Sequence, residues 1–172
     1  MKKYTISKKD FDKFDWGCYM EGYKDASMLL LNSLPMDQNK INKNVILPTL
    51  FIIRHFLELS FKEIISHENF LYGSETVKIE HNLKKIWKKV KPKIENKNNK
   101  EEIDKVNKMV TFFDDNDPES FAFRYPTDNK EHSFFTKEMS VDIESCKENF
   151  TVIQQFLSRI IIDYVRNIKY YK

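Results

Sequence analysis

The segment Ile46–Ser66, ILPTLFIIRHFLELSFKEIIS, constrains the fold of this chain more than any other stretch. It is the most apolar long segment of the sequence. With a turn of about 100° per residue, its apolar side chains cover roughly 200° of a helix surface. A surface helix needs about half that width. The segment is therefore predicted to be a central helix that several other helices contact.

Charged side chains form a stripe on this same predicted helix. Arg54, Glu58 and Lys62 follow one another at intervals of four residues, and His55 lies beside them. Because unpaired buried charge is costly, the stripe must find partners. One interpretation is a ladder of ion pairs along the helix. The other is half of a catalytic site, in which His55 transfers a proton, Arg54 neutralises a phosphate or another anion, Glu58 orients one of them and Lys62 contacts the substrate.

Length and composition predict one globular domain. The 172 residues include 41% hydrophobic residues, which is enough for a sizeable core, and we expect a flexible arm at 1–14 followed by a single domain at 15–172. Only three glycines are present, which argues against Rossmann folds and phosphate-binding loops. The isolated Cys18 and Cys146 form no CxxC half-site, and no HExxH spacing occurs. We therefore expect no metal and no cofactor.

The distribution of charge and apolar residues bears on location and partners. The N-terminus has no apolar signal region, and no run of about 18 uncharged apolar residues occurs, so we expect a cytoplasmic protein that does not span a membrane. The net charge is +3, but eight lysines lie in 84–100 and seven acidic residues in 101–119. The basic run could bind nucleic acid, or it could be the solvated face of a helix.

Periodicity along the chain predicts an all-α fold. Apolar residues recur at helical spacing in five stretches, and the links between them are short and polar. Between the last two stretches, residues 120–136 alternate aromatic and polar positions and predict a short hairpin or an extended segment. Together these features predict an antiparallel bundle of about five helices. The predicted helices are 16–34 capped by Asp15, 45–66 capped by Asn44, 83–91 ended by Pro92, 103–113, and 142–168 capped by Asp142 or Ser140.

His81 is a further candidate for the site. It lies at the predicted start of the third helix, where backbone N–H groups favour an anion. It could therefore belong to a catalytic site, or it could simply cap that helix together with Asn82.

Arg124 is the last candidate, because it is a single arginine among aromatic residues. It could stack on a ring and pair with an acid, which would pin the extended segment in place. Alternatively, it could bind an anion in a cleft shared with Arg54, His55, Glu58 and His81, with Tyr125 contacting the substrate. The neighbouring rings are those of Phe121, Phe123, Tyr125 and Phe134, and the candidate acids are Glu58, Asp117 and Asp128.

The sequence resembles a known superfamily. The segments LPTLFIIRHFLELSFKEII, HNLKKIW and DPESFAFRYPTD and the long C-terminal helix look like uncharacterised bacterial proteins related to HEPN-type helical domains. The resemblance implies a bundle of four or five helices that dimerises. Many such domains are metal-independent RNases of toxin–antitoxin, CRISPR-associated or phage-defence systems. In those, an R-x(4–6)-H motif faces its copy across the dimer, and the RNA 2′-hydroxyl is the nucleophile.

This chain departs from that motif. Arg54 is followed directly by His55, and seven residues separate Arg124 from His132. A site would have to be assembled from Arg54, His55, His81 or Arg124.

Three hypotheses for function follow from these patterns. The first is a HEPN-like protein that binds or cleaves RNA, with a homodimer and an antitoxin or defence protein as partners. If it is an enzyme, it would be a metal-independent endoribonuclease. The second is a non-catalytic, homodimerising interaction module. The third is a sensor of a nucleotide or small anion, since the same cleft could hold a phosphate.

Overall fold

The computed structural model describes residues 16–35, 42–73, 80–135 and 138–170, and these form an all-α fold. The predicted bundle of about five helices is confirmed. The predicted arm at 1–14 and the Asp15 cap lie outside the described residues. The elements are α1 (Trp16–Ser33), α2 (Lys43–Tyr72), α3 (Leu83–Ile94), the 3-10 helix η3 (Glu95–Lys97), α4 (Lys100–Asn116) and α5 (Ile143–Tyr170).

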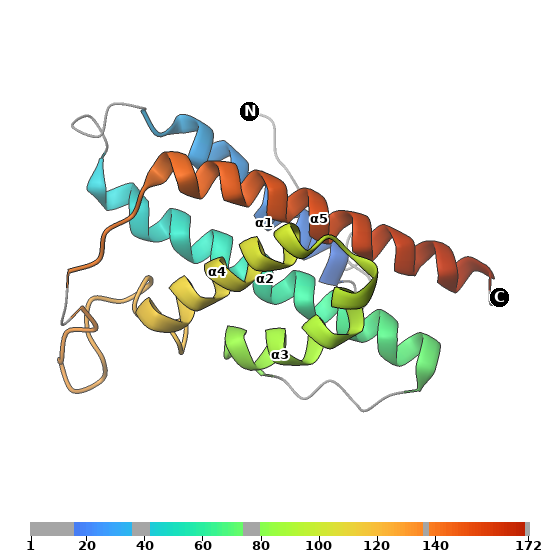
Figure 1. Cartoon of the computed structure of the whole chain (residues 1–172). Coiled ribbons are helices and arrows are strands. Elements are labelled where there is room, and N and C mark those ends of the chain that lie inside the picture. The colour runs from blue at the N-terminus through green and yellow to red at the C-terminus, as the bar shows by residue number, and fades with distance from the viewer. Residues whose placement is uncertain (1–15, 36–41, 74–79, 136–137, 171–172) are drawn as a thin grey trace, which may run out of the picture.

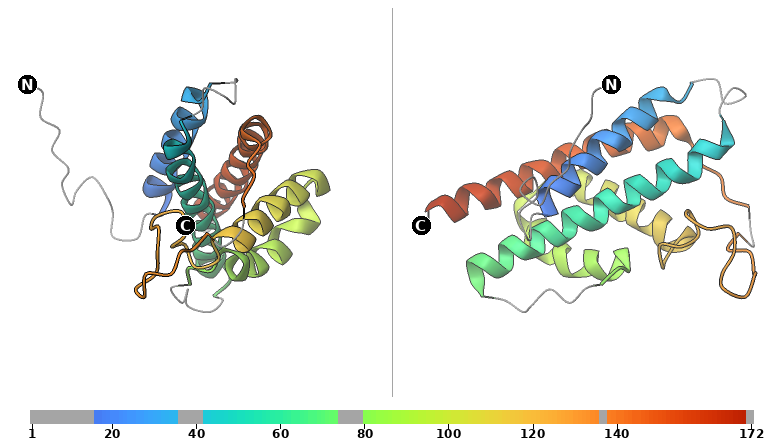
Figure 2. Two further views of the ribbon diagram at one scale, coloured as in Figure 1. Left: turned by 90° about the vertical axis from the view of Figure 1, so that its left-hand side faces the viewer. Right: turned by 180° about the vertical axis from the view of Figure 1, so that it is seen from behind.

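Helix α2 runs through the centre of the bundle (Figure 1). It packs against α1, α3 and α5, while α4 packs against α3 and α5. The sequential pairs α1–α2 and α3–α4 are antiparallel, but α2, α3 and α5 run in the same direction (Figures 1 and 2). α4 and α1 also run antiparallel to α5, on which both pack, so the bundle combines parallel and antiparallel helix pairs. The C-terminal end of α5 extends past the neighbouring helices (Figure 1).

The ends of α2 differ from those predicted. Its N-cap is Asn42, whose side-chain oxygen accepts a hydrogen bond from the N–H of Asn44 at 3.0 Å, so the cap lies two residues earlier than expected. Helix α2 also continues past Ser66 to Tyr72. Gly73 ends it at φ 64°, donating its N–H to the carbonyl of Asn69. The C-terminal end of α2 is therefore determined by a left-handed glycine cap. The weakening of the apolar pattern after Ser66 does not mark the end of the helix.

Helices α3 and α5 begin as predicted. The Asn82 side chain accepts from the N–H of Lys85 at 3.0 Å, and Asp142 accepts from the N–H of Ser145 at 3.1 Å. The predicted stop at Pro92 is wrong, since α3 continues to Ile94. Ile94 is buried in the core, and this burial stabilises the last turn although Pro92 supplies no backbone donor.

The connection between α4 and α5 contains the predicted hairpin in reduced form. A single antiparallel bridge joins Thr127 and Ser133, and within the described residues it belongs to no longer strand. The Asp128 carboxylate accepts hydrogen bonds from the N–H groups of Lys130 and His132, at 2.8 and 2.9 Å. Local side-chain bonds of this kind fold the tip of the segment.

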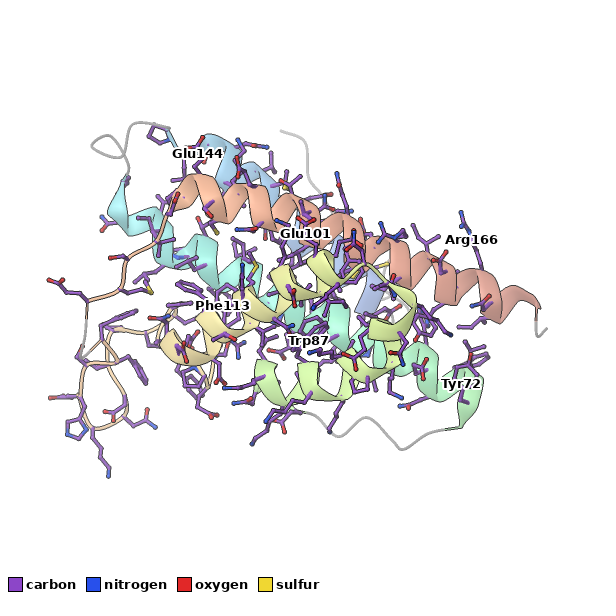
Figure 3. The ribbon with its side chains drawn as sticks, viewed as in Figure 1. Tyr72, Trp87, Glu101, Phe113, Glu144 and Arg166 are labelled. Atoms are coloured by element: carbon purple, nitrogen blue, oxygen red, sulfur yellow. The ribbon has the colours of Figure 1, made fainter. Side chains whose placement is uncertain are left out.

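One apolar core joins all five helices. Trp87 and Phe113 lie inside it, whereas Tyr72 and Arg166 lie at the surface (Figure 3). By length and composition alone Asn44–Tyr72 could cross a membrane, but 56% of its most apolar window is buried inside the bundle. That burial is typical of a core helix in a soluble protein. The absence of a membrane span stays a prediction.

Candidate functional site

Arg54 is the buried centre of the charged stripe on α2. Its exposed fraction is 0%, and all three of its guanidinium nitrogens donate hydrogen bonds. Nη1 donates to Glu58 Oε2 at 3.1 Å, and Nη2 to the carbonyl of His81 at 2.9 Å. Nε donates to the carbonyl of Asp117 at 3.3 Å. Arg54 therefore ties the start of α3 and the end of α4 to α2.

Glu58 lies between three cationic or polar partners. Its Oε1 accepts from Lys62 Nζ at 2.7 Å and lies 2.9 Å from Nδ1 of His81. Burial alone would raise the pKa of Glu58. The hydrogen bond and charge of Lys62, the contact with His81 and the charge of Arg54 outweigh burial and lower this pKa. Glu58 is therefore a buried carboxylate that stays ionised at neutral pH.

Lys62 completes this buried group. It is 4% exposed, and its Nζ lies over the ring of Trp16, 5.4 Å from the centroid. Direct contact of Lys62 or Arg54 with a substrate, which the sequence suggested, does not fit this burial. Both side chains instead neutralise Glu58. We call Arg54, Glu58 and Lys62 the Glu58 network.

His81 connects the buried Glu58 network to the protein surface. Its side chain is 63% exposed, although Nδ1 contacts the buried Glu58. An ionised carboxylate only accepts hydrogen bonds, so Nδ1 of His81 is the donor, and in the neutral ring Nε2 carries the lone pair. Within the described part of the chain, Nε2 has no hydrogen-bond partner. An imidazole oriented by a carboxylate, with its other nitrogen free, has the arrangement of a general base.

His55 lies apart from this contact. Its ring stands edge-on to Tyr23, with centroids 4.4 Å apart, and stacks on Phe51 at 5.8 Å. Burial lowers the pKa of His55; the charge of Glu58 opposes this effect, and the nearby cations reinforce it. His55 is therefore a neutral, half-buried packing residue at pH 7.

Arg124 lies on a cluster of aromatic rings. Its guanidinium carbon is 5.2 Å from the ring centroid of Phe51, 5.3 Å from that of Phe121 and 5.4 Å from that of Tyr125. Nε donates to the carbonyl of Ser120 at 2.6 Å. None of the three candidate acids forms an ion pair with Arg124 in the described residues. We call Arg124, Phe51, Phe121 and Tyr125 the Arg124 cluster.

Asp117 contacts a different arginine from the one considered in the sequence. It was a candidate partner of Arg124, but it lies beside Arg54, with Oδ2 4.0 Å from Arg54 Nε. Burial raises the pKa of Asp117; a hydrogen bond from the N–H of Ala122 at 2.9 Å and the charge of Arg54 oppose that rise. The acidic run at the end of α4 was the sequence signal for a buried acid near Arg54, but the sequence does not identify which of its acidic side chains is buried.

The five predicted catalytic residues thus fall into two neighbouring groups. Arg54, Glu58 and His81 contact one another directly, while His55 and Arg124 both contact Phe51. The segment after α4 links the groups, because the N–H of Ser120 donates to the carbonyl of Asp117, which also accepts from Arg54. Within the described residues, no group of three His, Cys, Asp or Glu side chains could hold a metal ion.

Comparison with protein-family models, curated proteins and solved structures finds no match to this chain. The resemblance to HEPN-type domains therefore rests on the sequence segments quoted above. Both that resemblance and an activity on RNA are proposals.

Proposed function

We propose that this chain is a HEPN-like protein that binds single-stranded RNA at the surface formed by the Arg124 cluster and the start of α3. The observation that carries the proposal is the exposed Arg124 guanidinium over three rings. A guanidinium close to aromatic rings still has N–H groups that can donate to a phosphate. Phe121 and Tyr125 are 46% and 51% exposed, so unpaired bases can stack on them.

The exposed lysines of α3 support RNA binding at the same surface. The start of α3 adjoins the segment after α4, because Asn82 Nδ2 donates to the carbonyl of Pro118 at 3.5 Å. Farther along α3, Lys85, Lys88 and Lys89 are exposed and form no ion pair with any described residue. Such lysines attract a phosphate backbone without reading its sequence. RNA of many sequences is therefore the expected ligand.

His81 gives this surface a catalytic group, and we extend the proposal to metal-independent cleavage. Nε2 of His81 accepts the proton of an RNA 2′-hydroxyl, and the 2′-oxygen attacks the adjacent phosphorus. The bond to the 5′-oxygen of the next nucleotide breaks, and that oxygen takes a proton from water. The products are a 2′,3′-cyclic phosphate and a free 5′-hydroxyl. Glu58 stabilises the imidazolium, and Arg124 offsets the charge that develops on the phosphate.

A cleavage assay tests the catalytic part. The substrate is a labelled single-stranded RNA of about 20 nucleotides. This length is greater than the roughly 4–16 nucleotides that one single-strand-binding domain covers. The RNA is incubated with the protein in EDTA. His132 provides a matched control, because its Nδ1 also lies near a carboxylate, Asp128, at 3.2 Å, but that pair is exposed.

The expected result is that His81→Ala slows cleavage by about 100-fold or more while RNA still binds, and that His132→Ala changes nothing. Equal cleavage by all three proteins, or by none of them, removes the catalytic part. Failure of the wild type to bind RNA removes the whole proposal. An antitoxin gene beside this one would favour the toxin–antitoxin context that the resemblance implies.

Self-association is a second candidate function. Ile162 and Val165, in the C-terminal half of α5, are 49% and 38% exposed. Exposed apolar residues that are neighbours on one helix are typical of an interface. This observation favours a homodimerising module, and a homodimer is also what the resemblance implies.

A further inference from the structure

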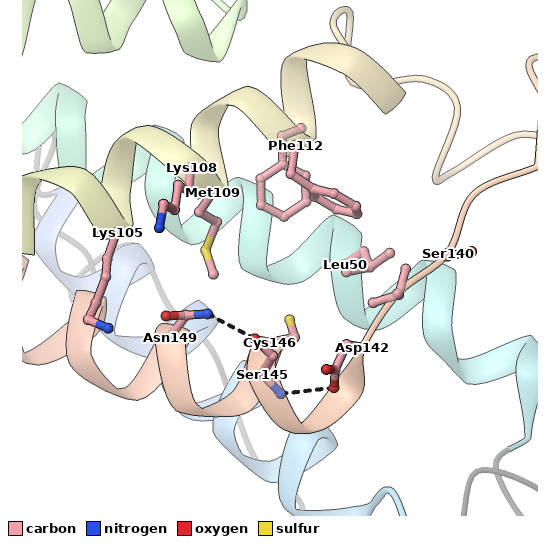
Figure 4. A pocket seen from close by; sticks show the side chains of 12 residues that line it. Leu50, Lys105, Lys108, Met109, Phe112, Ser140, Asp142, Ser145, Cys146 and Asn149 are labelled. Atoms are coloured by element: carbon pink, nitrogen blue, oxygen red, sulfur yellow. Dashed lines mark hydrogen bonds between the residues drawn. The ribbon is translucent and has the colours of Figure 1, made fainter.

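A cavity of about 210 Å³ lies between α4 and α5. None of its lining residues belongs to the Glu58 network or the Arg124 cluster. Most of its wall is apolar, and part of it is shown in Figure 4. The apolar lining residues are Leu50, Met109, Phe112, Phe113, Val141 and Cys146.

The polar lining residues are distributed unevenly. Lys105, Lys108 and Asn149 lie toward one end of the cavity, and Asp142 lies at the other (Figure 4). Lys105 is already 3.5 Å from Glu101, whereas Lys108 forms no ion pair with any described residue. Asp142 is held as the cap of α5 by the N–H of Ser145. One end of the cavity therefore offers lysine ammonium groups. Between the two ends lie apolar side chains and Ser145, whose Oγ accepts a hydrogen bond from Asn149 Nδ2 at 3.3 Å.

We propose that this cavity binds a small aliphatic carboxylate, with its chain between Leu50, Met109 and Phe112 and its carboxylate near Lys108. The cavity volume is about 210 Å³. It lies below the range of roughly 300–1,000 Å³ typical of drug-sized ligands. Hexanoate is therefore a suitable probe. A negative head group at the lysine end is attracted by Lys108 and lies far from Asp142.

The chain contains a reporter for occupancy of the cavity and an internal reference. Cys146 lines the cavity and is partly buried, whereas Cys18 is exposed on α1 and is not among the lining residues. Burial raises the pKa of Cys146 to about 11, so its alkylation is slow and is followed at alkaline pH. The full-length folded chain is labelled and then digested, and mass spectrometry of the peptides reports the two thiols separately.

The experiment measures alkylation of both cysteines with hexanoate, hexanol or hexylamine present. Hexanoate at ten times its Kd is expected to slow the labelling of Cys146 by about tenfold and to leave Cys18 unchanged. Lys108→Gln is expected to weaken hexanoate binding by about tenfold, through loss of a charge-assisted hydrogen bond. Lys88→Gln, an exposed lysine on α3, is the matched control and leaves binding unchanged. Titration calorimetry with hexanoate provides an independent Kd.

Several outcomes overturn the proposal. One is the absence of hexanoate binding by calorimetry. Another is equal protection of Cys146 by hexanoate and hexylamine, which would mean that the charged end has no role. A third is a Kd that neither Lys108→Gln nor Lys105→Gln changes. The RNA proposal does not depend on any of these results.

Discussion

Oε1 of Glu58 lies 2.9 Å from Nδ1 of His81, although the two residues are 23 positions apart in the sequence. Glu58 is 2% exposed, whereas the side chain of His81 is 63% exposed. Arg54 and Lys62 neutralise the carboxylate from the buried side. A buried set of charges thus holds one imidazole at the surface. The exposed His81 and Arg124 come from segments other than α2, and Glu58 on α2 contacts His81.

Replacing Glu58 tests the energetic role of the network. Glu58→Gln removes the carboxylate that bonds both Arg54 and Lys62, so it leaves the buried Lys62 without its counter-charge and Arg54 with the more distant Asp117, 4.0 Å away. The free energy of unfolding is expected to fall by about 3–5 kcal/mol. Glu101→Gln is the control, since its exposed pair with Lys105 should contribute about 1 kcal/mol or less. Urea unfolding measures both, and equal stability of the two variants would contradict a role for burial.

The same network predicts how stability depends on pH. The pKa of Glu58 is lowered in the folded chain from its ordinary value of 4.5. A carboxylate with a lowered pKa stabilises the fold above its unfolded pKa and loses this contribution as the pH falls through the folded value. The stability difference between wild type and Glu58→Gln should therefore be constant near neutral pH and shrink below pH 4.5. The raised pKa of Asp117 acts in the opposite direction, but it is common to both proteins and cancels to first order.

Urea unfolding of the wild type and Glu58→Gln at a series of pH values checks the direction in which their stability difference changes. A difference that grew as the pH fell toward about 3 would mean that Glu58 is protonated more readily in the folded chain, contrary to the pairing with Lys62.

Arg54 is expected to matter for stability, because it is buried and bonded to three partners. Arg54→Met removes one hydrogen-bond donor from Glu58 and one from each of the carbonyls of His81 and Asp117. We expect a loss of about 3–5 kcal/mol and a clearly lower Tm. Arg124→Ala removes an exposed cation from its rings and should cost about 1 kcal/mol. If Arg124→Ala lowered the Tm more than Arg54→Met does, the greater importance of Arg54 for stability would be contradicted.

Ile162 tests self-association. Ile162 is an exposed residue in the C-terminal half of α5. If this surface joins two copies, Ile162→Lys should shift a dimer to a monomer in sedimentation velocity, since it places a charge in an apolar contact. Gln155→Lys, at another exposed position of α5, is the control. A wild-type protein that stays monomeric at high concentration would exclude this surface as a stable dimer interface.

Helical geometry explains how much of this structure could be predicted from the sequence. The apolar stripe of 46–66 predicted a buried central helix, and residues 53, 56, 57 and 61 in it are completely buried. Spacing alone also placed Glu58 within reach of Arg54 and Lys62, because side chains four residues apart are neighbours on a helix. The end of α2 was missed because a local glycine cap determines it.

The contacts between segments could not be predicted in the same way. The approach of His81 to Glu58 depends on how α3 packs on α2, and neither local sequence encodes that distance. The stacking of Arg124 on Phe121 and Tyr125 was accessible to prediction, since the residues are close in sequence. Its contact with Phe51 was not, because it depends on where the segment after α4 lies across α2.

The RNA affinity of Arg124→Ala tests most directly the central claim that the Arg124 cluster binds single-stranded RNA. Fluorescence anisotropy with a labelled single-stranded RNA gives Kd for the wild type, for Arg124→Ala and for Arg166→Ala, which removes an exposed arginine on α5. We expect Arg124→Ala to weaken binding by about tenfold or more, through loss of a phosphate contact and of the support for stacked bases. Arg166→Ala should bind as the wild type does. Equal weakening by both variants, or no RNA binding by the wild type, would contradict an RNA site at the Arg124 cluster.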